Sequence, residues 1–228
     1  MLISEIFDSI DGEGVRAGRL CTFIRVVGCN LRCSYCDSMY AVEPEKYSSI
    51  RPKEMGITEI LSYVNRNYMR VTLTGGEPLL FPETVQLVNR LCDMGCEVNI
   101  ETNGSCDVVG FRNLIRNPDR LFFTVDFKLP SSGEMYSMRL SNFDNLRKND
   151  VLKFVIGTEE DLEIAVSLAH NAILKYGKDA PYIYCGTVFG GFELRDVIAE
   201  FMKDATLADV RFQIQMHKVI WDPNARGV

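Results

Sequence analysis

Short apolar segments alternate with helical patterns through most of this 228-residue chain. The apolar segments that we interpret as strands are 2–7, 20–27, 71–74, 98–101, 121–126, 151–156, 182–185 and 210–215. Apolar residues recur at helical spacing in the intervening segments 58–68, 82–94, 108–116, 159–176 and 194–203. This alternation predicts an α/β fold in which right-handed crossovers join the strands of a parallel sheet. The units are too few for a complete TIM-type barrel, so we expect a partial, open barrel of about six parallel strands.

The composition bounds the class of protein. The chain is 46% hydrophobic and 25% charged, which fits a single globular domain over residues 1–228. Its net charge of −6 gives no sign of a surface for nucleic acid or for an anionic membrane. No apolar run approaches the length of a membrane span, and residues 1–5 lack the basic start of a signal peptide. We therefore expect a cytoplasmic protein whose cysteines stay reduced, without a disulfide framework.

Three of the eight cysteines lie close together, directly after the expected strand 20–27. Their spacing is Cys29-x3-Cys33-x2-Cys36, and thiolates are soft ligands for iron and zinc. A closed zinc site needs four ligands, whereas the two histidines, His170 and His217, lie far along the chain. Three cysteines on a four-iron cluster leave one iron free to bind a small molecule, which favours catalysis. Structural thiols, a disulfide set and a Cys3His zinc site are the alternatives.

Polar or glycine-bearing segments follow several of the expected strands. Asp11-Gly12-Glu13-Gly14 follows the first strand, Gly75-Gly76-Glu77-Pro78 follows the third, and Asp126-Phe127-Lys128 ends the fifth. In a barrel of parallel strands the active site lies at the carboxyl ends of the strands, and glycine lets the backbone approach a ligand closely. Arg25 is the single charge in its apolar strand, where an unpaired charge is costly, so we expect it to be paired or functional.

Two motifs resemble the radical S-adenosylmethionine (SAM) superfamily. The cysteine segment is similar to its signature, including the aromatic Tyr35 before the third cysteine. Gly75-Gly76-Glu77-Pro78, one strand later, resembles its glycine-rich SAM motif. Both motifs occur in the expected order, each at the end of a strand, and this favours a radical SAM core.

The resemblance sharpens to the 7-carboxy-7-deazaguanine synthase family. The matching segments are Glu5-Ile6-Phe7, 11–14, 22–25, 28–30, Cys36-Asp37-Ser38 and the ending from His217 to Val228. Two segments depart from the family pattern. Asp11 stands where the family usually has Gln, and Asp126-Phe127-Lys128 stands where it commonly has Ser-Pro-Lys. The second departure is nearer the Asp-Leu-Lys of glycyl-radical activating enzymes.

The resemblance implies the cofactors and the residues that hold them. It implies a [4Fe-4S] cluster on Cys29, Cys33 and Cys36, with SAM bound to the fourth iron. The residues implied for SAM are Tyr35, Gly75, Gly76, Glu77, Asp126, Phe127, Lys128, Cys185 and Gly186. Because a radical derived from SAM carries the chemistry, no side chain is expected to act as a catalytic acid or base. Ser38 matches the family position whose hydroxyl binds Mg2+, a cation that prefers oxygen ligands; a helix-capping serine is the alternative.

The resemblance also implies the reaction. The family contracts 6-carboxy-5,6,7,8-tetrahydropterin to 7-carboxy-7-deazaguanine with loss of ammonia, a carbon–nitrogen lyase step in queuosine or deazapurine biosynthesis. Arg25 is the expected two-donor partner of the substrate carboxylate, and the N-terminal strand and C-terminal tail are expected to complete the pocket. The residues expected at the substrate are Ile10, Asp11, Gly12, Glu13, Arg25, Thr74 and Val228. A homodimer and an electron donor such as flavodoxin or ferredoxin are the implied partners.

Two other functions stay open on the sequence alone. A glycyl-radical activating enzyme shares the cluster, SAM and barrel but acts on a protein backbone. A non-catalytic metal-cluster module, acting as a sensor or carrier, binds metal without SAM and leaves Gly75-Gly76-Glu77 unexplained.

Overall fold

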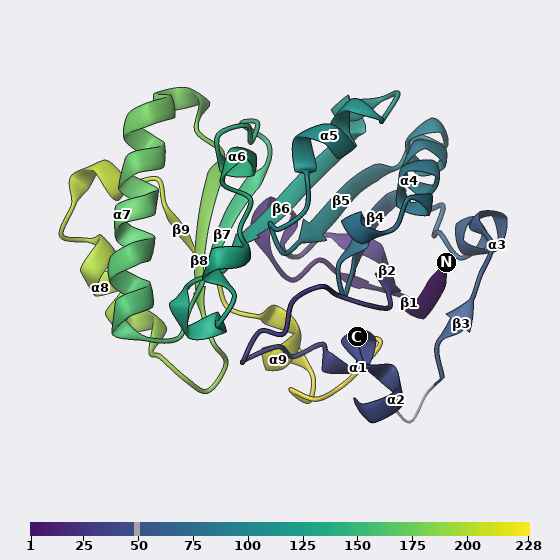
Figure 1. Ribbon diagram of the computed structural model, residues 1–228, viewed down its shortest axis with the longest axis horizontal. Coiled ribbons are helices and arrows are strands. Elements are labelled where there is room, and N and C mark those ends of the chain that lie inside the picture. Colours follow the sequence, from purple (N-terminus) through teal and green to yellow (C-terminus); the bar gives the residue numbers. More distant parts are fainter. Residues whose placement is uncertain (48–50) are drawn as a thin grey trace.

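The computed structural model describes residues 1–47 and 51–228. In these ranges nine strands form one curved sheet, in the order β3-β1-β2-β4-β5-β6-β7-β8-β9 (Figure 1). They are β1 (Leu2–Ile10), β2 (Leu20–Val26), β3 (Lys53–Glu54), β4 (Arg70–Gly75), β5 (Glu97–Thr102), β6 (Leu121–Phe127), β7 (Val151–Ile156), β8 (Tyr182–Thr187) and β9 (Arg211–Phe212). All neighbours from β2 to β9 are parallel, whereas β1 is antiparallel to both β2 and β3. The α/β fold predicted from the sequence is confirmed.

The longer helices cover one face of this sheet (Figure 1). The α-helices of the described ranges are α1 (Met39–Val42), α2 (Pro44–Tyr47), α3 (Ile57–Ser62), α4 (Glu83–Asp93), α5 (Val108–Asn113), α6 (Leu140–Phe143), α7 (Glu159–Tyr176), α8 (Leu194–Phe201) and α9 (Met216–Ile220). Helix α7 begins with a capping box, in which the Thr158 hydroxyl accepts from the Asp161 amide at 3.2 Å and the Asp161 carboxylate accepts from the Thr158 amide at 3.2 Å. Over the same ranges, none of the helices is both long and apolar enough to cross a membrane.

The two faces of the sheet differ in character, because alternate residues of a strand point to opposite faces. Toward the helices the strands present apolar side chains. One buried cluster joins Ile24, Leu73 and Ile100 to α4, and a second joins Phe154 and Ile183 to α7 and α8. The other face carries the polar residues of the strands, among them Arg25, Thr74, Glu101, Asp126 and Lys153. The core therefore lies between sheet and helices, and the inside of the partial barrel is left for a polar site.

The loop of residues 11–18 forms a floor inside the barrel, near the amino ends of the parallel strands. The Asp11 carboxylate accepts from the Thr72 hydroxyl on β4 at 2.8 Å. The Arg16 guanidinium stacks on the ring of Phe122 on β6, 4.0 Å from its centroid. The Gly14 amide donates to the Gln213 side chain at 2.9 Å, just after β9. Because β1 runs antiparallel to its neighbour, it delivers this loop to the end of the barrel opposite the cysteine loop.

Helix α3 is shorter than the sequence pattern indicates. The pattern predicts a helix to residue 68, but α3 ends at Ser62. Beyond it, the Asn65 amide donates to the Thr22 hydroxyl at 3.1 Å and the Asn65 side chain donates to Asp8 at 2.9 Å. These bonds hold Asn65 against the ends of β1 and β2, and a short polar side chain that bonds in this way competes with the helix.

The last strand and the tail also differ from expectation. The predicted strand 210–215 is reduced to β9 at Arg211–Phe212. The Gln213 amide still donates to the Cys185 carbonyl on β8 at 2.9 Å, while the Gln213 side chain reaches the floor loop. The segment that follows, expected as a strand end and tail, forms α9. The predicted irregular excursion over residues 41–56 contains α2 and β3, while its residues 48–50 lie outside the described ranges.

Candidate active site

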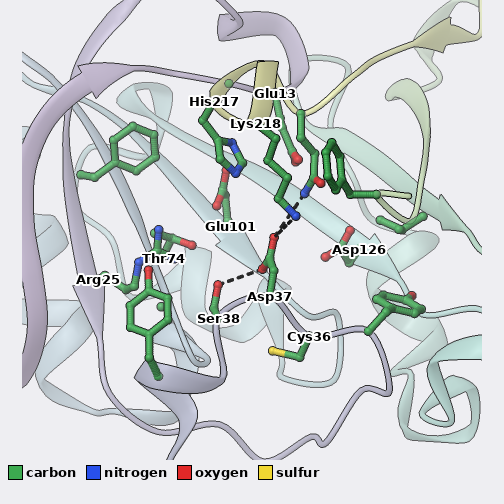
Figure 2. A pocket seen from close by; sticks show the side chains of 18 of the residues that line it. Glu13, Arg25, Cys36, Asp37, Ser38, Thr74, Glu101, Asp126, His217 and Lys218 are labelled. Atoms are coloured by element: carbon green, nitrogen blue, oxygen red, sulfur yellow. Dashed lines mark hydrogen bonds and ion pairs between the residues drawn. The ribbon is translucent and has the colours of Figure 1, made fainter. Parts of the chain in front are cut away.

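A cavity of about 530 Å³ occupies the polar side of the sheet. Figure 2 shows Arg25 and Thr74 on one side of it, Asp126 on the other, and Glu101 and His217 between them. Most of the residues predicted for the site line this cavity. They are Ile10, Gly12, Glu13, Arg25, Cys29, Cys33, Tyr35, Cys36, Ser38, Thr74, Gly75, Gly76, Asp126, Lys128 and Val228. Segments that lie far apart in the sequence therefore meet in one place.

Five predicted residues do not line the cavity, and their roles stay predictions. Asp11 is buried in the floor loop, and the Glu77 side chain is fully buried beneath the glycine turn. Phe127 packs on Phe143, with ring centroids 4.8 Å apart, and belongs with Cys185 to the core beside α7 and α8. Gly186 is buried on β8, where a Cβ would lie 3.3 Å from the carbonyl of Gln213.

The three cysteines of the loop after β2 are half-buried free thiols on the cavity wall. The loop is shaped by a turn in which the Cys36 amide donates to the Cys33 carbonyl at 3.2 Å. It is also fastened to the segment after β6, since the Ser34 amide donates to the Ser132 carbonyl at 3.0 Å. Burial raises the pKa of the Cys33 thiol to about 11 and also raises the pKa of Cys36. Because iron binds thiolates, loading this loop must release protons.

The donor set of this loop fits an iron–sulfur cluster. It supplies three soft ligands and one face open to a cavity, which leaves room for a fourth ligand that is not protein. Among the described residues, no three His, Cys, Asp or Glu side chains surround a point where a single metal ion could bind. A closed zinc site takes four protein ligands around one ion, whereas this loop supplies three cysteines.

The glycine turn after β4 is packed against the start of the cysteine loop. The Gly76 amide donates to the Val26 carbonyl at 3.1 Å, and the Glu77 amide donates to the Gly28 carbonyl at 2.8 Å. A Cβ at Gly75 would overlap the backbone of Val26, and one at Gly76 would overlap the carbonyl of Gly28. Only glycine fits this close approach of two backbones, so the turn and the cysteine loop are one structural unit.

Glu77 holds the loop after β5 in place through hydrogen bonds to its buried carboxylate. Its carboxylate accepts from the Leu79 amide at 2.9 Å, from the Thr102 hydroxyl at 2.8 Å and from the Asn103 amide at 2.7 Å. Burial raises the pKa of Glu77 to about 7, although these three bonds favour its ionised form. The bonds occupy both carboxylate oxygens, so Glu77 acts here as an anchor for Asn103. Asn103 was not among the residues predicted from the sequence, and its place directly after a strand is the signal that points to it.

Alternating charges run along the concave face from the floor loop toward the cysteines. Lys153 forms an ion pair with Glu13 and lies 3.8 Å from Asp126, and Lys128 pairs with Asp126 at 2.8 Å. Burial opposes these charges, but Lys128 and Lys153 hold the pKa of Asp126 below its usual value. Asp126 in turn raises the pKa of both lysines. Lys153 was not predicted, although it is the single charge of an apolar strand, the same signal that pointed to Arg25.

Arg25 is held by a carboxylate behind it. Its Nε donates to Glu5 Oε1 at 2.7 Å, and the Tyr40 hydroxyl donates to the same oxygen at 2.8 Å. Burial by itself would lower the pKa of Arg25, but Tyr40 and Glu5 raise it overall, so the guanidinium stays charged. The sequence expectation that Arg25 is paired is met by Glu5, and Arg25 also lines the cavity.

Two further cavity residues were missed at the sequence level, Glu101 on β5 and His217 on α9. Burial, with Glu13 and Asp11 nearby, raises the pKa of Glu101 to about 7. Burial lowers the pKa of His217, and the imidazole stands near Gly12 of the floor loop. Glu101 precedes the Thr-Asn-Gly segment at the end of its strand, which is the position where site residues gather in this fold.

Ser38 and Asp37 form a polar corner next to Cys36. The Ser38 hydroxyl donates to Asp37 at 3.0 Å, while Gln215 and Lys218 each approach the other Asp37 oxygen at 3.3 Å (Figure 2). Ser38 precedes α1, but its side chain accepts no hydrogen bond from the amides of that helix. The helix-capping alternative for Ser38 therefore has no support, whereas its hydroxyl does face the cavity.

Comparison with known proteins places the chain among relatives. Residues 23–129 match the model of the Radical SAM superfamily. A 7-carboxy-7-deazaguanine synthase from Clostridium acetobutylicum is 44% identical over 229 residues, covering 99% of this chain and 98% of that protein. One from Chlorobaculum tepidum is 41% identical over 231 residues, covering 99% and 96%.

A solved structure supports the same fold. The crystal structure of QueE from Escherichia coli superposes with a TM-score of 0.69 at 21% identity, covering 94% of this chain and 93% of that one. The predicted partial barrel with a radical SAM core agrees with this match. The chain therefore belongs to the 7-carboxy-7-deazaguanine synthase family of the radical SAM superfamily.

Proposed function

We propose that this chain is a 7-carboxy-7-deazaguanine synthase, which contracts 6-carboxy-5,6,7,8-tetrahydropterin and releases ammonia in queuosine or deazapurine biosynthesis. One observation carries the proposal: a single cavity brings together the cysteine loop, the glycine turn and Arg25. The relatives that cover the full chain bear the name of this activity. The glycyl-radical alternative rests on Asp126-Phe127-Lys128, whereas two relatives that cover the full chain carry the synthase name.

The cysteine loop and the glycine turn form the cofactor half of the cavity. Cys29, Cys33 and Cys36 would hold a [4Fe-4S] cluster, and when bound with SAM it supplies a 5′-deoxyadenosyl radical. Gly75 and Gly76 keep the wall beside the cluster free of side chains. Asp126, held ionised by two lysines, offers a carboxylate to the hydroxyls of a ribose. The work of these residues is to hold the reacting groups close together and apart from water.

The other half of the cavity suits a small, polar, planar substrate. Glu5 occupies Nε of Arg25, so the terminal nitrogens are left to form two parallel bonds with a carboxylate. The backbone of Ile10 and Gly12 and the Glu13 carboxylate, which line the cavity, would supply acceptors for the donors of an aminopyrimidinone ring. Thr74, at the end of β4, lies between the two halves. The C-terminal residues 223–228 lie along the same cavity and would cover a bound ligand.

The proposal also includes a magnesium site, a homodimer and a reductant. The Ser38 hydroxyl and the adjoining Asp37 carboxylate are hard oxygens of the kind that Mg2+ binds. A reductant such as flavodoxin or ferredoxin, a homodimer, a single domain over 1–228 and a cytoplasmic location stay predictions of the sequence and family.

The proposal is tested by an anaerobic assay of the reconstituted iron–sulfur protein. Dithionite, SAM, Mg2+ and 6-carboxytetrahydropterin are supplied, and 7-carboxy-7-deazaguanine is followed by mass spectrometry. We expect product only when reductant, SAM and pterin are all present, and none from the Cys33→Ala variant. If 5′-deoxyadenosine forms without 7-carboxy-7-deazaguanine, the protein is a radical SAM enzyme but the pterin is not its substrate. Omission of Mg2+ tests the role of Ser38 separately.

A further inference from the structure

We propose that Asn103 is a positioning residue of the iron–sulfur site, whose side-chain amide donates to the Cys29 sulfur and thereby raises the reduction potential of the cluster. The inference rests on the proposed cluster at Cys29, Cys33 and Cys36. Asn103 is 8% exposed, lines the cavity and follows β5 directly. Its Nδ2 lies 3.5 Å from Cys29 Sγ.

The orientation of the Asn103 amide is fixed by its neighbours. Asn103 Oδ1 lies 2.9 Å from the backbone nitrogen of Ser105. A backbone N–H can only donate, so the atom that faces it must be the amide oxygen. The NH2 group is therefore the end that faces the cysteine loop, and a flipped amide would set two donors against each other. The donor to Cys29 is thus a consequence of the packing.

Both hydrogens of this NH2 group have an acceptor in the cysteine loop. One is directed to Asn30 Oδ1 at 3.1 Å and the other to Cys29 Sγ. Asn30 in turn donates to the Ser105 hydroxyl at 2.9 Å, and that hydroxyl donates back to Asn103 Oδ1 at 2.6 Å. The three polar side chains form a closed ring, which leaves the amide little freedom to turn away from the sulfur.

The backbone of Asn103 is held as firmly as its side chain. The Asn103 amide donates to the fully buried Glu77, whose own amide donates to the Gly28 carbonyl next to Cys29. Cys29 is therefore approached by the glycine turn on its backbone side, and its sulfur accepts from the Leu31 amide at 3.4 Å as well as from Asn103. The same glycine turn is the proposed SAM wall, so Asn103 also ties the cluster ligand to the place where SAM would bind.

The effect on the potential follows from the charge that reduction adds. One electron from the reductant enters the cluster and increases the negative charge on its sulfur ligands. A fixed N–H dipole aimed at one of these sulfurs stabilises the reduced state more than the oxidised state. Removing this donor should therefore lower the reduction potential without removing any iron ligand.

The test is a redox titration of the reconstituted protein, followed by electron paramagnetic resonance of the reduced cluster. In Asn103→Ala we expect the ratio of reduced to oxidised cluster at the wild-type midpoint to fall about tenfold, equivalent to ~59 mV for one electron. Asn103→Asp retains an oxygen for Ser105, so it preserves the turn, and places a carboxylate oxygen toward the sulfur. We expect an equal or larger fall in that variant, with iron content per chain unchanged.

Ser105→Ala is the matched control. It breaks the ring at the hydroxyl but keeps the Ser105 backbone N–H that orients the amide, so we expect a fall in potential clearly smaller than that of Asn103→Ala. Unchanged potentials in loaded Asn103→Ala and Asn103→Asp would overturn the inference. Loss of the cluster from both Asn103 variants would also overturn it, because Asn103 would then be needed only for the structure of the loop. If the wild-type chain itself holds no cluster, the proposed function fails first and this inference with it.

Discussion

At the scale of single residues, the substrate half of the cavity depends on how Arg25 is supported. A guanidinium on a flexible stem loses rotational freedom when it binds a carboxylate in the two-bond geometry. Here Glu5 Oε1 already accepts from Arg25 Nε, and the Tyr40 hydroxyl holds the same oxygen in place. Arg25 is therefore oriented before a ligand arrives, by two side chains that need not touch the ligand.

Replacing Glu5 should weaken substrate binding through Arg25. In Glu5→Gln the Arg25 guanidinium loses its charged partner and keeps only a weaker amide acceptor, so we expect the KM for the pterin to rise about tenfold, as a charge-assisted bond of ~1.5 kcal/mol implies. Arg25→Ala should have a larger effect. Steady-state kinetics with SAM saturating provide the measurement. Glu59→Gln, which removes the exposed partner of Lys53, is the control and should leave both KM values unchanged. An equal rise in the KM for SAM would contradict the assignment.

Glu101 gives the protein a pH dependence with a definite sign. Its pKa is raised from 4.5 in the unfolded chain to about 7 in the folded one, so the folded state binds the proton more tightly. The resulting stabilisation is complete below pH 4.5 and is lost as the pH rises through about 7. A shift of this size corresponds to at most about 3 kcal/mol.

The Glu101→Gln variant should therefore lose less stability than the wild type between pH 5 and pH 8. The amide cannot ionise, so the cost of a buried charge at the higher pH disappears. Urea denaturation of the apoprotein at several pH values measures the difference. If the free energy of unfolding varies with pH in the same way in the two proteins, Glu101 has the same pKa in the folded and the unfolded chain.

At the scale of elements, the cysteine loop and the glycine turn behave as one part. The turn approaches the loop too closely for any side chain at Gly75 or Gly76. Two backbone hydrogen bonds, Gly76 to Val26 and Glu77 to Gly28, close the contact. The glycines thus serve the geometry of the cysteine loop as well as the space for a ligand.

Gly76→Ala should disturb the cluster as well as SAM binding. The added Cβ must displace the Gly28 carbonyl, and Cys29 moves with it. We expect iron per chain after reconstitution to fall at least twofold and the Kd for SAM to rise about tenfold, a change of ~1.4 kcal/mol. Gly56→Ala is the matched control, because nothing lies within 4 Å of its added Cβ. If Gly76→Ala keeps its full iron content and only SAM binding is weakened, Gly76 serves SAM binding and not the geometry of the cysteine loop.

At the scale of the whole molecule, the cavity is bounded by segments from both ends of the described chain. The floor loop 11–18 closes the amino ends of the strands, and residues 223–228 lie along the other side of the cavity. The Arg226 guanidinium stacks on Tyr40, 4.1 Å from its ring centroid, and donates to the Tyr47 carbonyl at 3.3 Å. The barrel between these segments supplies the walls.

Removing residues 223–228 should open the substrate side of the cavity. We expect the KM for the pterin to rise about tenfold or more, a loss of at least ~1.4 kcal/mol of binding. Cleavage of SAM by the reduced enzyme should persist, because the cysteine loop and glycine turn are untouched. Product and 5′-deoxyadenosine are quantified in parallel. Wild-type coupling between the two in the shortened chain would contradict a covering role for the tail.

The features that were predicted correctly from the sequence are those that depend on the spacing of residues within one segment. The α/β alternation, the cysteine loop and the glycine turn are each local patterns, and each was found where expected. Lys153, Glu101 and Asn103 were not predicted as site residues, because a lone charge in a strand or a polar residue at a strand end is a weak signal by itself, and it is the curvature of the sheet that gathers the three. The antiparallel direction of β1 was missed for a similar reason. An alternating pattern reports which residues share a face, but not which way the strand runs.

The position of Lys153 has a thermodynamic consequence. Its ammonium contacts Glu13 on the proposed substrate side and Asp126 on the proposed SAM side, so each ligand alters the electrostatic surroundings of the other. A coupling of this kind is reciprocal: the factor by which the pterin changes the affinity for SAM equals the factor by which SAM changes the affinity for the pterin. Equilibrium dialysis of each ligand with and without the other measures both factors. In Lys153→Met we expect both affinity factors to shift equally toward a value of one, whichever ligand binds first.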